Sequence, residues 1–151
     1  MLGRVTPEPP CPVCEIVAGR VRPAGGVLWR DERFVVYGFP DPSPVRGYVL
    51  VTTVRHLRGL YDLDDAEAAA LAPLLIQVQR AQRTALGADH AYAFVLGDKV
   101  PHFHAHVVPR FPDSPPHLRG GRLFQATVAD ARPLDEIEAA AKRLAEALNP
   151  R

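Results

Sequence analysis

The sequence predicts a single α+β domain built around a mostly antiparallel β-sheet. Its 151 residues fit one domain, and the hydrophobic share of 47% is enough for a packed core. Segments with strand composition come first, a long amphipathic helix follows, and further strands precede a second helix. This order groups the strands instead of alternating them with helices, which favours antiparallel pairing. We therefore expect about five strands, one long helix and a C-terminal helix.

Residues 1–10 are rich in proline, and we predict a flexible leader there. Cys11 and Cys14 follow, spaced as CxxC, and they are the two cysteines of the chain. In a chain without a larger cysteine framework, this spacing indicates metal or redox chemistry. Residues 14–20 can form a short helix that ends at Gly19.

A hairpin is predicted next, because residues 27–30 and 33–39 have strand composition and flank Asp31-Glu32. Two prolines and a glycine make residues 41–47 a loop. The β-rich run 48–52 then predicts a central strand.

The long helix begins at a capping box, in which Asp64 and Glu67 take the two capping positions. It is predicted to run to about Leu86, before Gly87, and Pro73 should kink or divide it. Its core-facing stripe consists of residues at helical spacing: Leu71, Leu74, Leu75, Val78 and Gln82.

The remaining elements are two strands, a loop and a helix. Strands are predicted over 91–96 and 103–108, and a loop rich in proline and glycine over 111–122. The final helix, Leu134–Leu148, has one apolar side: Leu134, Ile137, Ala141, Leu144 and Leu148.

The net charge and the hydropathy of the sequence limit the kinds of partner that we expect. The formal charge of +1 gives no global attraction for nucleic acid or an anionic membrane. No apolar run approaches the length of a bilayer span, and the N-terminal residues lack the apolar core of a signal peptide. We therefore expect a cytoplasmic protein with neither a nucleic-acid polymer nor a membrane as partner.

The run from His102 to Val108 carries the strongest signal for chemistry. In a strand, His102, His104 and His106 share one face, while Phe103, Ala105 and Val107 fill a core on the other. Imidazoles on a rigid strand suit chemistry near neutral pH. The alternatives are a solvent-facing strand that happens to carry histidines, or a tract that binds metal adventitiously.

The same run matches the HxHxHxx motif of the histidine triad (HIT) superfamily, which this chain resembles over residues 11–112. The other matching pieces fall in the family's order: Cys11-Pro-Val-Cys14 with Ile16 and Gly19, Asp31-Glu32, Asp41-Pro-Ser-Pro44, Gly47-Tyr-Val-Leu-Val51, His56 and Pro109-Arg110. The resemblance implies the HIT-like fold over residues 11–112. We expect residues 113–151 to form a C-terminal loop and helix packed on the same domain, and the alternative is a helix that reaches a partner subunit. It also implies a homodimer.

A structural zinc ion is implied by the zinc-containing CxxC branch of that superfamily. Carried over, its ligands are Cys11, Cys14, His56 and His102. Four protein ligands leave no open position for water, so this zinc would be structural. The alternatives are cysteines that are free or disulfide-bonded, and a His56 that is an ordinary surface residue.

The resemblance further implies catalysis at the α-phosphate of a nucleotide conjugate, either a dinucleoside polyphosphate or a nucleoside phosphoramidate. His104 would attack the phosphorus and form a covalent nucleotidyl-histidine that water cleaves. A hydrogen bond from its Nδ1–H to a backbone carbonyl would leave Nε2 free to attack. A cationic His106 would stabilise the developing charge, and the alternative for His106 is an orienting role.

Four further residues are predicted to bind the substrate. Asp41 matches the position that binds ribose hydroxyls, although it could simply form the turn before Pro42. Tyr48 stands where the family has a histidine, and its hydroxyl could donate a hydrogen bond towards the triad. Gly97 and Lys99 lie in a shortened segment that lacks the family's Asn and Gln; they could contact phosphate, or Lys99 could be a solvated turn residue.

Aromatic residues near a base pocket are a weaker signal. Trp29, Phe34 and Phe39 are candidates, but aromatic residues in strands are more often core. Two rival functions also remain: a nucleotide-binding module with little turnover, and a metal-binding protein that uses the histidine run.

Overall fold

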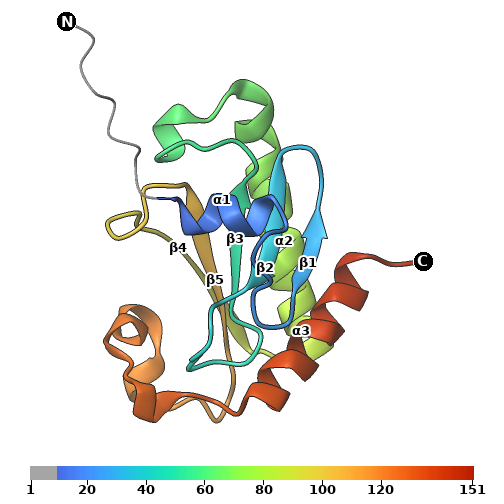
Figure 1. Cartoon of the computed structure of the whole chain (residues 1–151). Coiled ribbons are helices and arrows are strands. Elements are labelled where there is room, and N and C mark those ends of the chain that lie inside the picture. The colour runs from blue at the N-terminus through green and yellow to red at the C-terminus, as the bar shows by residue number, and fades with distance from the viewer. Residues whose placement is uncertain (1–9) are drawn as a thin grey trace, which may run out of the picture.

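The computed structural model describes residues 10–151 and confirms the α+β architecture with its antiparallel sheet (Figure 1). The predicted leader lies outside the described residues, apart from Pro10. The sheet has the strand order β1-β2-β3-β5-β4. Its strands are β1 (Val27–Arg30), β2 (Phe34–Gly38), β3 (Val49–Thr53), β4 (His90–Val95) and β5 (His104–Arg110).

The hairpin between β1 and β2 forms where the acidic pair predicted it. The Asp31 carboxylate accepts the backbone N–H groups of Arg33 at 2.8 Å and Phe34 at 2.7 Å, which closes the turn. On the other side of the sheet, β5 lies between β3 and β4. Its register places His104 opposite Thr52 and His106 opposite Leu50, so both histidines are held in the interior of the sheet rather than at an edge.

The long helix α2 (Asp65–Leu86) begins at the predicted capping box and ends at Gly87, whose φ of 78° gives the left-handed cap. The prediction that Pro73 divides it is wrong, because α2 continues without a break. Pro73 has no backbone N–H, so the carbonyl of Ala69 lacks its usual hydrogen bond within the helix. Both residues lie on the exposed side of the helix. Water can satisfy that carbonyl while the buried face stays packed.

One face of the sheet packs against α2 and α3 (Leu134–Leu148). Its core contains the three residues that alternate with the histidines, Phe103, Ala105 and Val107, together with Leu74 and Leu144. On α3 the predicted apolar side is buried except for Leu134, which is 49% exposed because it sits in the first turn, where the helix leaves the core.

The opposite face, which carries the histidines, is covered by two separate parts of the chain. Helix α1 (Pro12–Val17) lies across it near the start of β5, and Ile16 packs into its apolar cluster (Figure 1). The C-terminal segment covers the other end through Leu118 and Leu123. The predicted loop 111–122 therefore contains short helical turns: η2 (Pro116–Leu118), η3 (Gly120–Gln125) and, after it, η4 (Val128–Asp130).

Among residues 10–151, no helix combines the length and the apolar character that a membrane crossing would need.

Candidate functional site

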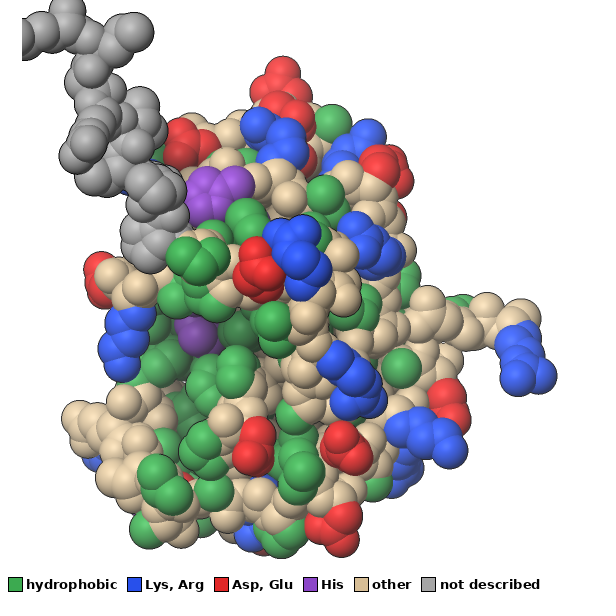
Figure 2. All heavy atoms as spheres, in the orientation of Figure 1, with side chains coloured by type: hydrophobic (Ala, Val, Ile, Leu, Met, Phe, Trp, Pro, Cys, Tyr) green, Lys and Arg blue, Asp and Glu red, His purple; other side chains and the backbone are tan. Residues whose placement is uncertain are grey.

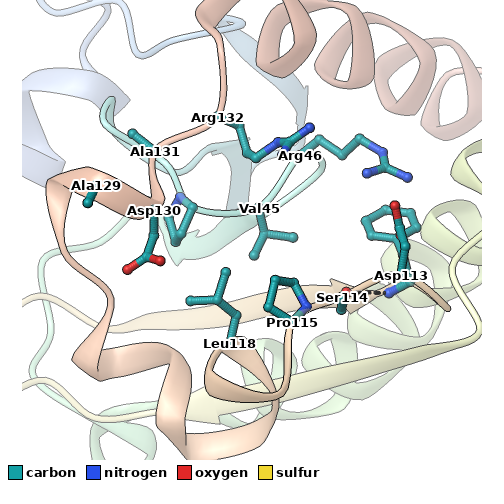
Figure 3. A pocket seen from close by; sticks show the side chains of 12 residues that line it. Val45, Arg46, Asp113, Ser114, Pro115, Leu118, Ala129, Asp130, Ala131 and Arg132 are labelled. Carbon is teal, nitrogen blue, oxygen red and sulfur yellow. Dashed lines mark hydrogen bonds between the residues drawn. The ribbon is translucent and has the colours of Figure 1, made fainter.

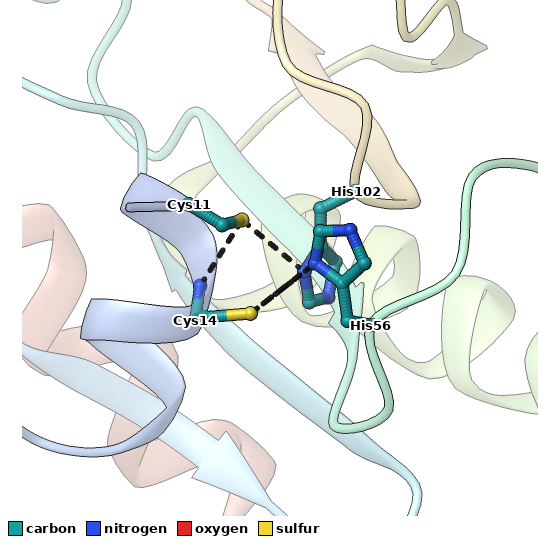
Figure 4. Close-up of side chains that lie close together, drawn as sticks. All are labelled: Cys11, Cys14, His56 and His102. Carbon is teal, nitrogen blue, oxygen red and sulfur yellow. Dashed lines mark hydrogen bonds between the residues drawn. The ribbon is translucent and has the colours of Figure 1, made fainter. Parts of the chain in front are cut away.

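A cluster of cysteine and histidine side chains forms where α1 meets the start of β5 (Figure 4). Cys11 and Cys14 come from the N-terminal end of α1, His56 from the loop after β3, and His102 from the residue pair before β5. One ligand atom from each residue lies within 4.8 Å of every other. The four predicted metal ligands are thus brought together from three distant parts of the chain.

Distances within this cluster fit a tetrahedral zinc site. The Nδ1 atoms of His56 and His102 are 3.2 Å apart, and the Cys14 Sγ lies 3.3 Å from His56 Nδ1 and 3.5 Å from His102 Nδ1. Zinc bonds of about 2.3 Å to sulfur and about 2.05 Å to nitrogen, at tetrahedral angles, give separations of about 3.6 Å for S–N and about 3.3 Å for N–N. The cluster can therefore bind a zinc ion, as predicted.

The orientation of His102 favours the same conclusion. Its side chain is fully buried, and its Nε2 lies 2.8 Å from the carbonyl oxygen of Thr53. A carbonyl can only accept, so Nε2 carries the proton and donates it, and the lone pair of the neutral ring is on Nδ1. Burial lowers the pKa of His102, which keeps the ring neutral. A backbone acceptor behind a ligating imidazole is the usual way to fix its tautomer.

His104 is oriented by a second backbone carbonyl. Its Nδ1 lies 2.7 Å from the carbonyl oxygen of His102, so Nδ1–H donates and the neutral imidazole carries its lone pair on Nε2. The His104 and His106 rings are neighbours, with centroids 5.0 Å apart. Because side chains alternate along β5, His104 and His106 lie next to each other on the same face of the sheet. His102, just before the strand, belongs to the metal cluster instead.

His106 is held by Tyr48, whose hydroxyl oxygen lies 2.7 Å from Nδ1 of His106. Burial, and to a lesser extent the nearby His104, lower the pKa of His106 to about 4. The His106 ring is therefore neutral near pH 7 in this structure, where the sequence analysis expected a cation. The ring still has one N–H, which can donate a hydrogen bond.

A cavity of about 330 Å³ opens in front of these two imidazoles. His104, His106, Gly97 and Lys99 all line it. Gly97 has a φ of 89°, a left-handed conformation that glycine adopts without strain, and it turns the chain between β4 and Lys99. Figure 2 shows a histidine at the bottom of a hollow that is surrounded mainly by hydrophobic side chains, with a basic side chain at its left rim.

Asp41 is not among the residues that line this cavity. Its side chain is exposed, and the adjacent Pro40 lines the cavity in its place. Of the three aromatic candidates, Phe39 lines the cavity, Phe34 is fully buried in the core and Trp29 packs against that core.

The sequence analysis missed Phe124, which also lines the cavity. Its ring lies 5.4 Å from that of His106, at an interplanar angle of 83°. Phe124 belongs to η3, a short turn without apolar periodicity, so no sequence pattern could indicate that its side chain reaches the triad. Leu96 and Val100 are further lining residues from the segment before β5.

A second cavity, of about 270 Å³, lies between residues 44–46 and the C-terminal segment (Figure 3). Its two arginines, Arg46 and Arg132, lie 3.8 Å and 2.9 Å from the carboxylate of Glu136, and none of the predicted site residues line it. The backbone N–H of Arg132 donates to the carbonyl of Ser43 at 2.8 Å. This region therefore fastens the C-terminal segment to the loop after β2.

Comparison with protein families gives one match that covers more than half of the chain. The family described as HIT domain matches residues 26–113. The match includes the histidine run and His56, and it ends before the segment that carries Phe124. No protein among the curated sequences matches this chain.

Solved structures with a similar fold cover most of the chain. A zinc-bound histidine triad family protein from Mycobacterium smegmatis is 28% identical, with a TM-score of 0.70, over 91% of this chain and 92% of that one. A hypothetical histidine triad nucleotide-binding protein from Sulfolobus tokodaii is 19% identical, with a TM-score of 0.72, over 91% of both chains. A Hit-like protein from Bartonella henselae is 16% identical, with a TM-score of 0.69, over 91% of this chain and 95% of that one.

Proposed function

This chain belongs to the HIT domain family, and we propose that it hydrolyses or transfers nucleotides at the α-phosphate of a nucleotide conjugate, through a covalent bond to His104. The observation that carries the proposal is the hydrogen bond from His104 Nδ1–H to the His102 carbonyl. It leaves the Nε2 lone pair available on a residue that lines a cavity. Neutral imidazole is an effective nucleophile near pH 7.

In the first step, Nε2 of His104 forms a bond to the α-phosphorus while the bond from phosphorus to the leaving group breaks. The leaving group departs with the bonding pair and takes a proton from water. The ring becomes cationic, and its Nδ1–H remains bonded to the His102 carbonyl, which stabilises the positive charge. In the second step, water attacks the phosphorus, the N–P bond breaks, and the lone pair returns to Nε2. The attacking water gives up its proton to the hydroxide that the first step left in solvent, so the ring returns to its neutral form.

His106 serves as a neutral hydrogen-bond donor in this proposal. The Tyr48 hydroxyl, 2.7 Å away, donates to Nδ1 of His106, which places the ring proton on Nε2. From there it can donate to a phosphoryl oxygen as negative charge builds up. Lys99 adds positive charge, and the turn at Gly97 offers backbone N–H groups to the same phosphate.

Asp41 remains the proposed partner of the ribose hydroxyls, supported by its position next to Pro40 at the edge of the cavity. Dinucleoside polyphosphates and nucleoside phosphoramidates are the proposed substrate classes. Zinc bound to Cys11, Cys14, His56 and His102 would fix α1 against the start of β5, and the four ligands leave no position for substrate.

We also propose a cytoplasmic location, where thiols stay reduced and available to a metal. A homodimer is proposed from the family resemblance.

The direct test is to trap the intermediate. Incubation with an adenylated substrate, followed by acid quench and mass spectrometry, should show one nucleotidyl adduct on His104. The His104→Ala variant should give neither adduct nor turnover. His90→Ala is the matched control, because His90 is exposed on β4 and does not line the cavity.

The rival functions give different results in the same experiments. Nucleotide binding with neither adduct nor turnover across a panel of conjugates would reject the enzyme in favour of a binding module. A metal ion that survives Cys11→Ser but is lost with His104→Ala would instead indicate a metal-binding triad.

A further inference from the structure

Gln82 is a buried polar residue of α2 that the proposed mechanism does not use. Its side chain is fully buried where α2 packs on the sheet, on the face opposite the histidines. Its Nε2 lies 3.0 Å from the carbonyl oxygen of Gly47 and 3.0 Å from that of Val107. Carbonyls can only accept, so the amide nitrogen faces both of them and donates its two hydrogens. Gln82 thus joins the chain just before β3 to β5.

Pro109 explains why Gly47 needs a donor from outside the sheet. Strands β3 and β5 are antiparallel with Val49 opposite Val107, and two residues further this register brings Gly47 opposite Pro109. A Cβ placed on Gly47 would lie 3.4 Å from Cγ of Pro109, so the two residues lie side by side. Proline has no N–H to donate across the pairing. The amide of Gln82 takes the place of this missing donor.

The oxygen of the same amide has no such partner. Gln82 Oε1 is buried, and none of residues 10–151 donates a hydrogen bond to it. A buried oxygen without a partner is unfavourable, whereas an apolar side chain of similar length would fill the same space without that cost. What the amide contributes here is therefore its pair of donated hydrogen bonds, rather than its packing.

The two bridged carbonyls flank the residue pair that orients the site. Gly47 directly precedes Tyr48, and Val107 directly follows His106. On the opposite face of the sheet, the Tyr48 hydroxyl lies 2.7 Å from Nδ1 of His106. Because Tyr48 lies just outside the pairing of β3 with β5, the bridge through Gln82 extends that pairing by one step.

We infer that Gln82 is a positioning residue that holds Tyr48 at hydrogen-bond distance from His106. It does so by supplying Gly47 with the hydrogen bond that Pro109 cannot give. The effect on the reaction rests on the proposed function, in which a correctly oriented His106 donates to a phosphoryl oxygen. Gln82 does not line the cavity, so it acts on the site only through the backbone that it bridges.

Gln82→Met tests the inference, because methionine has a similar length and no donor. Nitrogen-15 NMR of the imidazoles in the zinc-bound protein reports the hydrogen bond at His106 without any substrate. The Nδ1 resonance of His106 should move towards its position in Tyr48→Phe, while that of His104 should stay in place. With substrate, kcat should fall by about five-fold at an unchanged KM, since the hydrogen bond is weakened rather than removed.

Gln79→Met is the matched control on the same helix. Gln79 lies one turn earlier on α2, and its Nε2 is 3.5 Å from the carbonyl oxygen of Ala91 on β4. It contacts neither of the carbonyls that Gln82 bridges. This variant should therefore keep the wild-type kcat and the wild-type resonance of His106.

Pro109→Val provides a rescue that a general loss of packing would not show. Valine restores a backbone N–H opposite Gly47, so the donor from α2 is no longer required there. In the Pro109→Val background, adding Gln82→Met should leave kcat and the His106 resonance close to their values without it.

The outcomes distinguish this inference from the catalytic proposal. An unchanged His106 resonance in Gln82→Met would overturn the inference, as would an equal effect of Gln82→Met with and without Pro109→Val. A shifted resonance in a protein that turns over no conjugate would support the inference, and the catalytic proposal alone would fail. If Gln82→Met does not fold, Gln82→Asn, which draws the amide back from both carbonyls, takes its place. Failure of both variants to fold would indicate a role in stability alone and would overturn the inference.

Discussion

The hydroxyl oxygen of Tyr48 lies 2.7 Å from Nδ1 of His106, across the pairing of β3 with β5. Tyr48 is 4% exposed, and burial raises the pKa of its phenol, so the hydroxyl remains protonated and can donate to the imidazole. Tyr48 thus orients a ring that is itself neutral.

Replacing Tyr48 with phenylalanine tests this relationship. Tyr48→Phe removes the donor and leaves Nδ1 of His106 without a partner, so kcat should fall by about ten-fold, corresponding to about 1.4 kcal/mol, with little change in KM. Steady-state kinetics measures both.

A double variant tests whether Tyr48 affects kcat through His106 or through a direct contact with the substrate. If Tyr48 acts through His106, then Tyr48→Phe should cost nothing further in a His106→Gln background. Additive losses would show instead that the hydroxyl contacts substrate directly.

Metal analysis should find about one zinc per chain. Cys11→Ser should lose that zinc and lower the melting temperature by at least about 5 °C, because α1 is no longer fastened to β5. A chelator should lower the melting temperature of the wild type and leave that of Cys11→Ser unchanged. His104→Ala should keep the zinc; loss of metal in that variant would contradict the four-ligand site.

The low pKa of His106 predicts a pH dependence of stability. Above pH 6.5 the His106 ring is neutral in both the folded and the unfolded protein, so its titration does not change the free energy of unfolding. Between pH 6.5 and about 4 the unfolded chain binds the proton and the folded one does not, so the free energy of unfolding should fall.

His106→Gln provides the comparison, because it cannot titrate. Denaturation by urea at several pH values should show a smaller loss of stability between pH 6.5 and 4 in this variant than in the wild type. The zinc ligands also take up protons in that range, but they do so in both proteins and cancel in the difference. Parallel curves would mean that His106 has an ordinary pKa.

The proposed homodimer can be tested at the edge of the sheet. Within residues 10–151, β4 is an edge strand that pairs with β5 alone. On the α2 side of this strand, Val95 is 41% exposed. An open edge with exposed apolar side chains is suited to pair with a second copy. Sedimentation should show a dimer for the wild type and a shift to monomer for Val95→Glu. Val128→Glu, at an exposed position outside the sheet, should stay dimeric, and a monomeric wild type would refute the proposal.

Local patterns in the sequence were enough for most of the fold. The capping box at Asp64 and Glu67 predicted the start of α2, and the alternation along residues 102–108 predicted which side chains of β5 face the core. These patterns succeed because capping and periodicity depend on neighbouring residues. The predicted division of the helix at Pro73 was wrong because the cost of a proline depends on which side of the helix faces water, and this is a tertiary property.

By itself, the sequence determined the strand that carries the histidines, the four metal ligands through their resemblance to a family, and the elements of the sheet. Only the tertiary structure decided the rest of the site. Cys11 and His102 meet across 91 residues, and Phe124 reaches His106 through an irregular segment. The neutral charge of His106 follows from its burial, and the exposed side chain of Asp41 follows from the path of its loop. Contacts, burial and charge state depend on the register of the strands and on the paths of the loops. A pattern of neighbouring residues cannot predict these features, because they arise between segments far apart in the sequence.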